Sequence, residues 1–200
     1  MKKTIAIMLA LVLCAGALNA QENRKGQWTV GVAGGYAQRG LFNDDSKNSL
    51  LTQSYEIGVV SGFMFNSHLG IKAELISSKE YKNDNTMNSG VSGLNLFVAA
   101  KYEWQWNHLF VDVVAGPGYT YQNVKNVIEI PGESVNDIHA LSLGIEPVVG
   151  WRFNEHWGIM LSNRWDCYVY DTQYKTLTDG NDGATFSGGF HATLGVAYTF

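Results

Sequence analysis

The connections between the hydrophobic runs constrain this chain most, because they alternate strictly between long and short along the sequence. The long connections are rich in Asn, Asp, Ser, Gly and Lys, and they cover residues 38–54, 79–93, 122–140 and 171–188. The short connections have only a few residues each and lie around 66–68, 105–108 and 154–156. An up-and-down β-barrel with tight turns at one rim and extended loops at the other predicts this alternation.

Eight runs with period-two hydrophobicity lie between these connections, and each has about ten residues or more, typical of strands with two different faces. They cover residues 28–37, 55–65, 69–78, 94–104, 109–121, 141–153, 157–170 and 189–200. Eight is an even number, as a closed antiparallel barrel with both chain ends on one side requires.

One face of each run is almost wholly apolar, while the other mixes Gly, Ala, Thr and charged residues. Two kinds of barrel fit this pattern: a soluble lipocalin with the apolar face inside, or an outer-membrane barrel with the apolar face outside. The sequence GQW at residues 26–28 even resembles the Gly-x-Trp that opens lipocalins.

Three features favour the membrane barrel. The polar face is small and Gly-rich, as a tight interior needs, and no segment resembling the closing helix of a lipocalin follows the last run. Aromatic residues gather at both ends of the apolar face, as the two membrane interfaces select. They are Trp28, Phe65, Trp104, Trp151, Phe153, Trp157, Tyr198 and Phe200 near the short turns, and Tyr36, Tyr55, Tyr119 and Tyr121 near the long loops. We therefore predict an all-β, eight-stranded antiparallel up-and-down transmembrane β-barrel.

The first twenty residues have the pattern of a secretory signal peptide. Lys2 and Lys3 precede an apolar stretch at 5–13, and small residues follow up to Ala20. Leu13 stands where a lipoprotein signal needs a small residue before Cys14. The prediction is a signal peptide at 1–20 and a barrel domain at 21–200, in the outer membrane of a Gram-negative cell, with extracellular loops and periplasmic termini.

Charge and cysteine content narrow the function classes. Without Lys2 and Lys3 the chain has 12 basic and 18 acidic residues and no basic stripe, which argues against a nucleic-acid partner. Cys167 is then the only cysteine, so no intramolecular disulfide can form. No run of 18 apolar residues follows the signal, so a helical membrane span is not predicted.

The closing residues TLGVAYTF at 193–200 resemble the assembly signal of outer-membrane proteins, with Thr193, Gly195, Tyr198 and Phe200 in the four characteristic places. That resemblance implies recognition by the barrel-assembly machinery. The whole mature chain is similar to small barrels of the OmpX and OmpA transmembrane-domain type. The stretches GPGY at 116–119 and WRFNEHWGI at 151–159 are also similar to porin-like barrels of Bacteroidota.

The alternation places ten charged side chains inside the barrel, six acidic and four basic, which can pair with one another. They are Glu56, Lys72, Glu74, Lys101, Glu103, Asp112, Glu146, Arg152, Arg164 and Asp166. Five bulky residues point inward too: Met64, Phe97, Phe110, Val114 and Met160. An eight-stranded barrel is just wide enough for side chains to fill it. A plugged lumen is expected, as OmpX-like and OmpA-like relatives imply; the alternative is a narrow pore gated by this network.

Catalytic and metal motifs are incomplete. Lipid A deacylases carry His-x-Ser-Asn, and Ser162 and Asn163 match half of it, but Met160 occupies the His position, so the serine lacks a base. In DGNDG at 179–183, Asp179 and Asn181 fit a calcium loop, but no Glu follows at the required distance. We predict no enzyme activity and no cofactor.

Three histidines, His68, His108 and His156, recur in the short connections MFNSHLGIK, WQWNHLFVD and RFNEHWGIM. Consecutive short turns are two strands apart, about 10 Å at the usual strand spacing. Metal ligands must converge to about 2 Å from one ion. We therefore predict that these histidines mark turns at the periplasmic rim and bind no common metal.

Asn163 is predicted to face lipid near the middle of the membrane, where a carboxamide is unexpected. It could mark a β-bulge, as could Pro117 and Pro147, because a prolyl nitrogen cannot donate to the ladder.

The expected function is that of a membrane anchor, in contact with outer-membrane lipid and lipopolysaccharide, that presents slightly acidic loops for adhesion, envelope integrity or ligand binding. OmpX-like relatives imply this class of role. The candidate contact residues are Phe42, Tyr81, Val127, Ile128 and Ile130. Ile128 and Ile130 could instead extend their strands and expose a sheet edge that recruits a partner strand.

Overall fold

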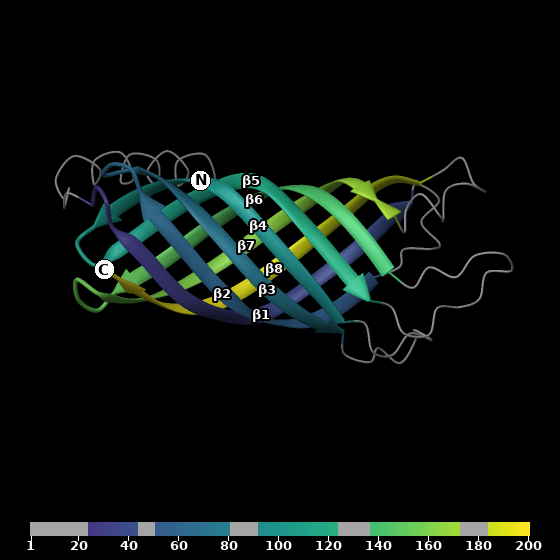
Figure 1. Cartoon of the computed structure of the whole chain (residues 1–200), viewed down its shortest axis with the longest axis horizontal. Helices are drawn as coiled ribbons and strands as arrows, with labels where there is room; N and C mark the ends of the chain where they lie inside the picture. The colour runs from purple at the N-terminus through teal and green to yellow at the C-terminus, as the bar shows by residue number, and fades with distance from the viewer. Residues whose placement is uncertain (1–23, 44–50, 81–91, 124–136, 173–183) are drawn as a thin grey trace, which may run out of the picture.

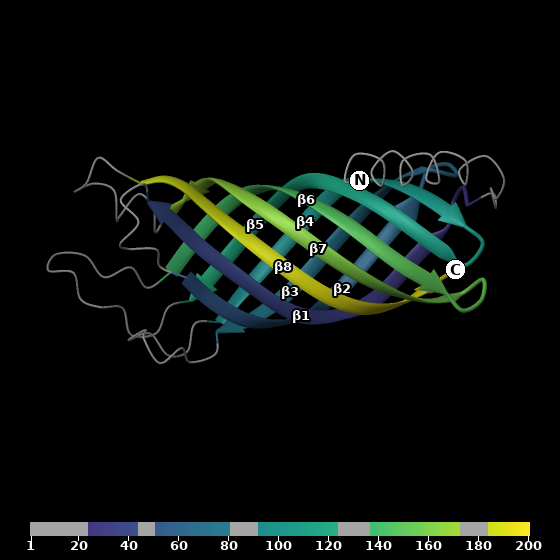
Figure 2. The ribbon, with the colours of Figure 1, turned by 180° about the vertical axis from the view of Figure 1, so that it is seen from behind.

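The eight strands of the chain close into one antiparallel barrel in the order in which they occur in the sequence. The computed structural model describes residues 24–43, 51–80, 92–123, 137–172 and 184–200. The strands are β1 (Trp28–Asn43), β2 (Leu51–Met64), β3 (Leu69–Glu80), β4 (Ser92–Trp106), β5 (Leu109–Asn123), β6 (Asp137–Arg152), β7 (Trp157–Asp171) and β8 (Ala184–Thr199). They slant around the barrel in both views, and the chain's C-terminal end lies at the rim of the short turns (Figures 1 and 2). The predicted fold is confirmed.

The apolar face of every strand points outward. Large exposed residues of this face include Val32, Ile57, Leu143 and Leu194, each at least 59% accessible, while lumen-facing Phe97 and Val114 are fully buried. An outer surface this apolar is stable only in lipid, because water would not solvate it. No helix in the described ranges is long and apolar enough to cross a membrane.

The strand ends at the two rims differ in how well the sequence predicted them. At the short-turn rim, β1, β3, β5 and β7 begin at the predicted residues. At the other rim the strands run further than predicted: β1 continues from Ala37 to Asn43, and β8 begins at Ala184 rather than at residue 189. The extensions were missed because alternation depends on lipid on one side, and it fades where water reaches both faces while the ladder continues.

The predicted bulges at Pro117, Pro147 and Asn163 are wrong. The β6–β7 register is the same on both sides of Pro147, with Ile145 opposite Trp165 and Val148 opposite Ser162. The β4–β5 register also passes Pro117 without a shift. Each proline only interrupts the pairing locally. The observed irregularities lie elsewhere, between Leu141 and Ser142 and between Phe42 and Asn43.

Each histidine of the short turns forms hydrogen bonds to the strand beyond the one that its turn leads into. The β2–β3 turn is thereby bonded to β4, the β4–β5 turn to β6, and the β6–β7 turn to β8. The carbonyl of His68 accepts from the N–H of Glu103 on β4 at 2.8 Å, and its ring Nδ1 lies 2.9 Å from the Glu103 carbonyl. His108 makes the same two contacts with Arg152 on β6, and His156 makes them with Thr199 on β8. We call these three arrangements the histidine latches. Since a carbonyl only accepts, Nδ1 carries the proton in each latch.

The latches leave no common metal site for the three histidines. Each ring Nδ1 is occupied by a different carbonyl, and the three latches join different strands. No group of three or more potential ligands suited to a metal occurs within the described ranges. The turns also use Asn, because Oδ1 of Asn66 and of Asn154 accepts two backbone N–H groups each, whereas Asn107 takes a positive φ of 51°.

Candidate functional site

The ten charged residues predicted for the lumen all lie on the inner face, and each takes part in at least one ion pair. Together with Arg24 and His191, they divide into three groups along the barrel axis. We call these the central cluster (Lys72, Glu74, Glu146 and Arg164), the loop-side cluster (Glu56, Asp166 and His191) and the turn-side cluster (Arg24, Lys101, Glu103, Asp112 and Arg152).

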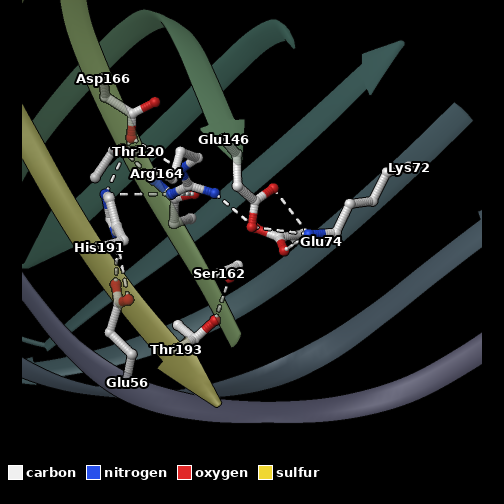
Figure 3. A network of polar contacts seen from close by, with 11 residues as sticks. Glu56, Lys72, Glu74, Thr120, Glu146, Ser162, Arg164, Asp166, His191 and Thr193 are labelled. Carbon is white, nitrogen blue, oxygen red and sulfur yellow. Dashed lines mark hydrogen bonds and ion pairs between the residues drawn. The ribbon is translucent and has the colours of Figure 1, made fainter. Parts of the chain in front are cut away.

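The central cluster crosses the lumen from β3 to β6 and β7. Lys72 Nζ lies 2.7 Å from Oε1 of Glu74 and 2.8 Å from both carboxylate oxygens of Glu146. Arg164 donates from Nη1 to Oε2 of Glu74 at 2.8 Å. All four residues are at most 6% exposed. Figure 3 shows Lys72 reaching toward both carboxylates, with Arg164 beside them. Two cations and two anions therefore neutralise one another across the barrel.

The loop-side cluster is built around His191 on β8, which lies between two carboxylates (Figure 3). Its Nδ1 is 3.0 Å from Glu56, and its Nε2 is 3.0 Å from Asp166. Arg164 joins this group to the central cluster, since its Nε donates to Asp166 at 3.1 Å. Arg164 also donates to Oδ1 of Asn95 at 2.7 Å, so the guanidinium contacts β3, β4 and β7.

The turn-side cluster has Glu103 on β4 as its hub. Its carboxylate pairs with Lys101 at 2.7 Å, with Arg152 at 2.9 Å, and with Arg24, which precedes β1 and is 4% exposed. Lys101 also pairs with Asp112 on β5 at 3.2 Å. The N-terminal segment is thus held inside the rim of the short turns.

An apolar layer separates the turn-side cluster from Asn95 along β4. It consists of Phe97, Ala99, Phe110, Val114 and Val148, with Met160 packed against it. Glycines on β6 make room for its rings: a Cβ at Gly150 would lie 2.1 Å from Cζ of Phe110. Met64, also predicted to point inward, is 2% exposed. The small residues of the polar face therefore allow bulky side chains to fill the lumen.

Two small cavities lie on either side of the central cluster. The turn-side cavity, of about 50 Å³, is lined by Lys101, Asp112 and Arg152 among others, and it reaches Lys72. The loop-side cavity, of about 20 Å³, is lined by Arg39, Glu56, Glu80 and His191 among others. Lys72 lines the first cavity, and Glu56 and His191 line the second, so the central cluster and part of the apolar layer lie between them.

Four lumen residues are missing from the predicted charge network. Arg39 and Glu80 are buried on the inner face, and extending the period-two pattern by two residues past Ala37 and Ser78 would have found them. The alternation of the last run places His191 on the polar face, but its charge partners could not be deduced without the fold. Arg24 precedes the first strand, so no alternation marks it.

The Ser162 hydroxyl is hydrogen-bonded to polar side chains inside the barrel, among them Thr193 and Glu146. Ser162 faces the lumen at 4% exposure, and its hydroxyl is 2.7 Å from that of Thr193. Asn163 lies on the opposite, outer face of β7. Asp179 and Asn181, and the predicted contact residues Tyr81, Val127, Ile128 and Ile130, lie outside the described residues, as does the predicted signal peptide. Of the contact residues, Phe42 lies in β1, where its backbone pairs with Phe186.

The residues of the C-terminal motif occupy both faces of β8. Thr193 and Gly195 face inward, and a Cβ at Gly195 would lie 3.0 Å from Cε of Met160. Tyr198 stacks on the His156 ring of the third latch, with centroids 5.2 Å apart, and packs against Phe200 on the outer side. The Phe200 N–H donates to the Trp28 carbonyl at 2.8 Å, which helps to close the barrel.

Comparison with known families agrees with this architecture. The family model for the outer membrane protein beta-barrel domain matches residues 6–200, nearly the whole chain. The chain belongs to this family. It is therefore an outer-membrane barrel, and its apolar outer face contacts membrane lipid, including lipopolysaccharide.

Solved structures of small outer-membrane barrels share the fold. Neisserial surface protein A aligns with a TM-score of 0.62 at 16% identity, over 88% of this chain and 100% of that one. OprG of Pseudomonas aeruginosa aligns with a TM-score of 0.56 at 13% identity, over 91% of this chain and 99% of that one. Ail, the attachment invasion locus protein of Yersinia pestis, aligns with a TM-score of 0.53 at 13% identity, over 88% of this chain and 99% of that one.

No curated protein sequence shows significant similarity to the chain. The similarity to Bacteroidota barrels stays a prediction, because the structures named above come from other bacteria.

Proposed function

We propose that this protein is a structural, surface-presenting barrel whose lumen is plugged and whose activity resides in its four long loops. In this account the short turns and the termini lie in the periplasm, and the loops face the exterior. The loops then serve adhesion, envelope integrity or binding of an external ligand.

The observation that carries this proposal is the closed lumen. Three ionic clusters and an apolar layer occupy the part of the barrel that the structure describes, and the cavities on either side of the central cluster are small, about 50 and 20 Å³. Breaking a buried ion pair by removing one partner costs about 3–5 kcal/mol. A lumen with many such pairs resists rearrangement, so it favours a scaffold over a conduit.

The loop composition and two structural neighbours agree with a surface role. Residues 44–50, 81–91, 124–136 and 173–183 together contain seven acidic and four basic side chains and are otherwise mostly polar. The neighbours named above include a neisserial surface protein and an attachment invasion locus protein. We propose that this chain likewise acts at the cell surface.

Replacing one loop at a time tests this role. Each of the four segments is exchanged for a short Gly-Ser linker, and cells displaying each variant are assayed for binding to matrix-coated surfaces and host cells. We expect at least one exchange to abolish binding while the barrel still migrates differently before and after heating in detergent gels. Equal binding by all four variants and by cells without the protein would contradict the proposal.

A second candidate function is a narrow channel gated by the central cluster. The two cavities favour it, because they extend the space inside the barrel toward the turn rim on one side of the central cluster and toward the loop side on the other. Exchange of partners among Lys72, Glu74, Glu146 and Arg164 would be the gating step. Single-channel recording separates the two candidates, since only a channel produces conductance steps.

Two further assignments concern the assembly of the barrel in the membrane and catalysis. We assign recognition by the barrel-assembly machinery to Thr193, Gly195, Tyr198 and Phe200, whose aromatic members lie on the outer side near the end of β8. We assign no catalysis, because the Ser162 hydroxyl is turned toward Thr193 inside the lumen and no histidine lies at position 160.

A further inference from the structure

Asn163 places a carboxamide on the lipid-facing side of β7. It is partly exposed, and its outward neighbours on the same and adjacent strands are apolar and exposed: Ile145, Leu161, Trp165 and Leu194. Trp157 at the short-turn rim is six residues away, which on a strand tilted by about 40° amounts to about 15 Å along the membrane normal. Asn163 therefore lies close to the middle of the hydrocarbon layer.

Pro147 adds a second polar defect at the same place. It stands opposite Asn163, and the β6–β7 pairing is interrupted at this position, whereas the pairing of Pro147 with Val113 on β5 is intact. The missing proline N–H thus faces β7, and the ladder leaves the Asn163 carbonyl without its usual donor. In hydrocarbon an unsatisfied backbone group is costly, because no water can replace the donor.

Pro117 provides an internal comparison. The β4–β5 pairing is interrupted in the same way at Pro117, whose missing N–H faces Val98. Val98 is apolar, so the barrel tolerates a prolyl gap without a polar side chain next to it. The carboxamide of Asn163 is therefore not required to repair the ladder, and among the described residues it has no hydrogen-bond partner.

We infer that Asn163 marks a surface on which a second copy of this chain docks within the membrane. A carboxamide both donates and accepts, so two copies related by a twofold axis along the membrane normal satisfy each other. Nδ2 of Asn163 donates to Oδ1 of the partner's Asn163, and the reverse bond forms by symmetry. Ala192, which pairs with Asn163 on β8, is small, which lets the partner's carboxamide approach on that side.

The native cysteine gives a direct probe of this dimer. Cys167 is exposed on the same outer face of β7, four residues toward the loop rim, so two copies in this arrangement carry it at the same height. The protein in native outer membranes is treated with a long, flexible bis-maleimide, because the strand tilt places the two thiols about 17 Å apart on opposite sides of the twofold axis. Crosslinked dimer is measured on denaturing gels. The matched control carries Cys167→Ser with Leu75→Cys, which moves the probe to β3 across the barrel, where Leu75 is 48% exposed.

We expect dimer from Cys167 and little from Leu75→Cys. Asn163→Leu should weaken association roughly three- to tenfold, as loss of hydrogen bonds between membrane segments does. Sedimentation in detergent measures the strength of association directly, and Asn163→Gln should retain part of the association. Monomer at all protein concentrations, or equal association of wild type and Asn163→Leu, would overturn the inference. Crosslinking of Leu75→Cys as efficient as that of Cys167 would also overturn it, since it indicates random contact.

Discussion

Arg164 on β7 and Glu74 on β3 lie 90 residues apart in the sequence, yet Nη1 of Arg164 is 2.8 Å from Oε2 of Glu74 inside the barrel. The same guanidinium contacts Asp166 and Asn95 and lies 4.7 Å above the ring of Phe97. Arg164 therefore links the central cluster, the loop-side cluster and the apolar layer.

Arg164→Met should destabilise the barrel by about 3–5 kcal/mol, because it leaves buried carboxylates without their cation. Urea unfolding in lipid vesicles, followed by tryptophan fluorescence, measures the change. The double variant Glu74→Met/Arg164→Met should recover part of the loss, since it removes both charges of the pair. If the single variant unfolds at the wild-type urea concentration, the cluster does not stabilise the fold.

Glu103→Ala should release the N-terminal segment, because the Arg24 guanidinium is held at the turn-side rim by the Glu103 carboxylate. An arginine-specific protease should then cleave after Arg24, which is buried in the wild type at 4% exposure. Mass spectrometry detects the shortened chain. Glu155→Ala, an exposed change in the turn between β6 and β7, is the control and should leave Arg24 protected. Rapid cleavage of the wild type after Arg24 would show that the segment is not held in the lumen.

The ring hydrogen bond of each histidine latch should contribute about 1 kcal/mol, the usual net value of one hydrogen bond. His108→Ala removes the contact between the ring Nδ1 and the Arg152 carbonyl at 2.8 Å. The variant with all three latch histidines changed to alanine should lose about 3 kcal/mol in the same unfolding experiment if the latches are independent. An unchanged free energy of unfolding in that variant would mean that the backbone bonds alone hold the turns.

Gly150→Val should prevent or slow folding, because its Cβ would lie 2.1 Å from Cζ of Phe110. Phe110→Ala in the same chain should restore folding only in part, since it removes the ring but leaves the Ile159 carbonyl oxygen 2.6 Å from the new Cβ. The fraction folded is read from heat-modifiable migration in detergent gels. Gly62→Ala is the matched control, because its Cβ would meet only the Ile71 carbonyl oxygen at 3.4 Å. Normal folding of Gly150→Val alone would show that the lumen is less tightly packed than described.

The fold was predictable because lipid and tight turns impose rules on the sequence. Trp28, Leu69, Leu109 and Trp157 begin their strands where predicted, since the short turns leave no freedom at that rim. Arg39 and Glu80 were missed because alternation fades where water reaches both strand faces. The prolines were misjudged because a missing N–H interrupts the pairing without shifting the register.

The lumen site was predictable only in part. Alternation gives the face on which a side chain lies, so the inward position of Lys72 and Glu146 followed from the sequence. Alternation does not show which side chains pair with each other. The 2.8 Å contact between Lys72 and Glu146 depends on the tilt and stagger of strands that are far apart in the chain. For the same reason the place of His191 between Glu56 and Asp166 required the closed barrel.

The closed lumen is tested most directly by single-channel recording of the purified, refolded protein in planar lipid bilayers. The account predicts no conductance steps for the wild type, because paired charges and the apolar layer fill the barrel. The triple variant Glu74→Ala/Phe97→Ala/Arg164→Ala serves as a positive control, and it should conduct because it removes side chains of both the central cluster and the apolar layer. Reproducible, discrete conductance steps from the wild type would contradict the plugged barrel and establish the gated channel in its place.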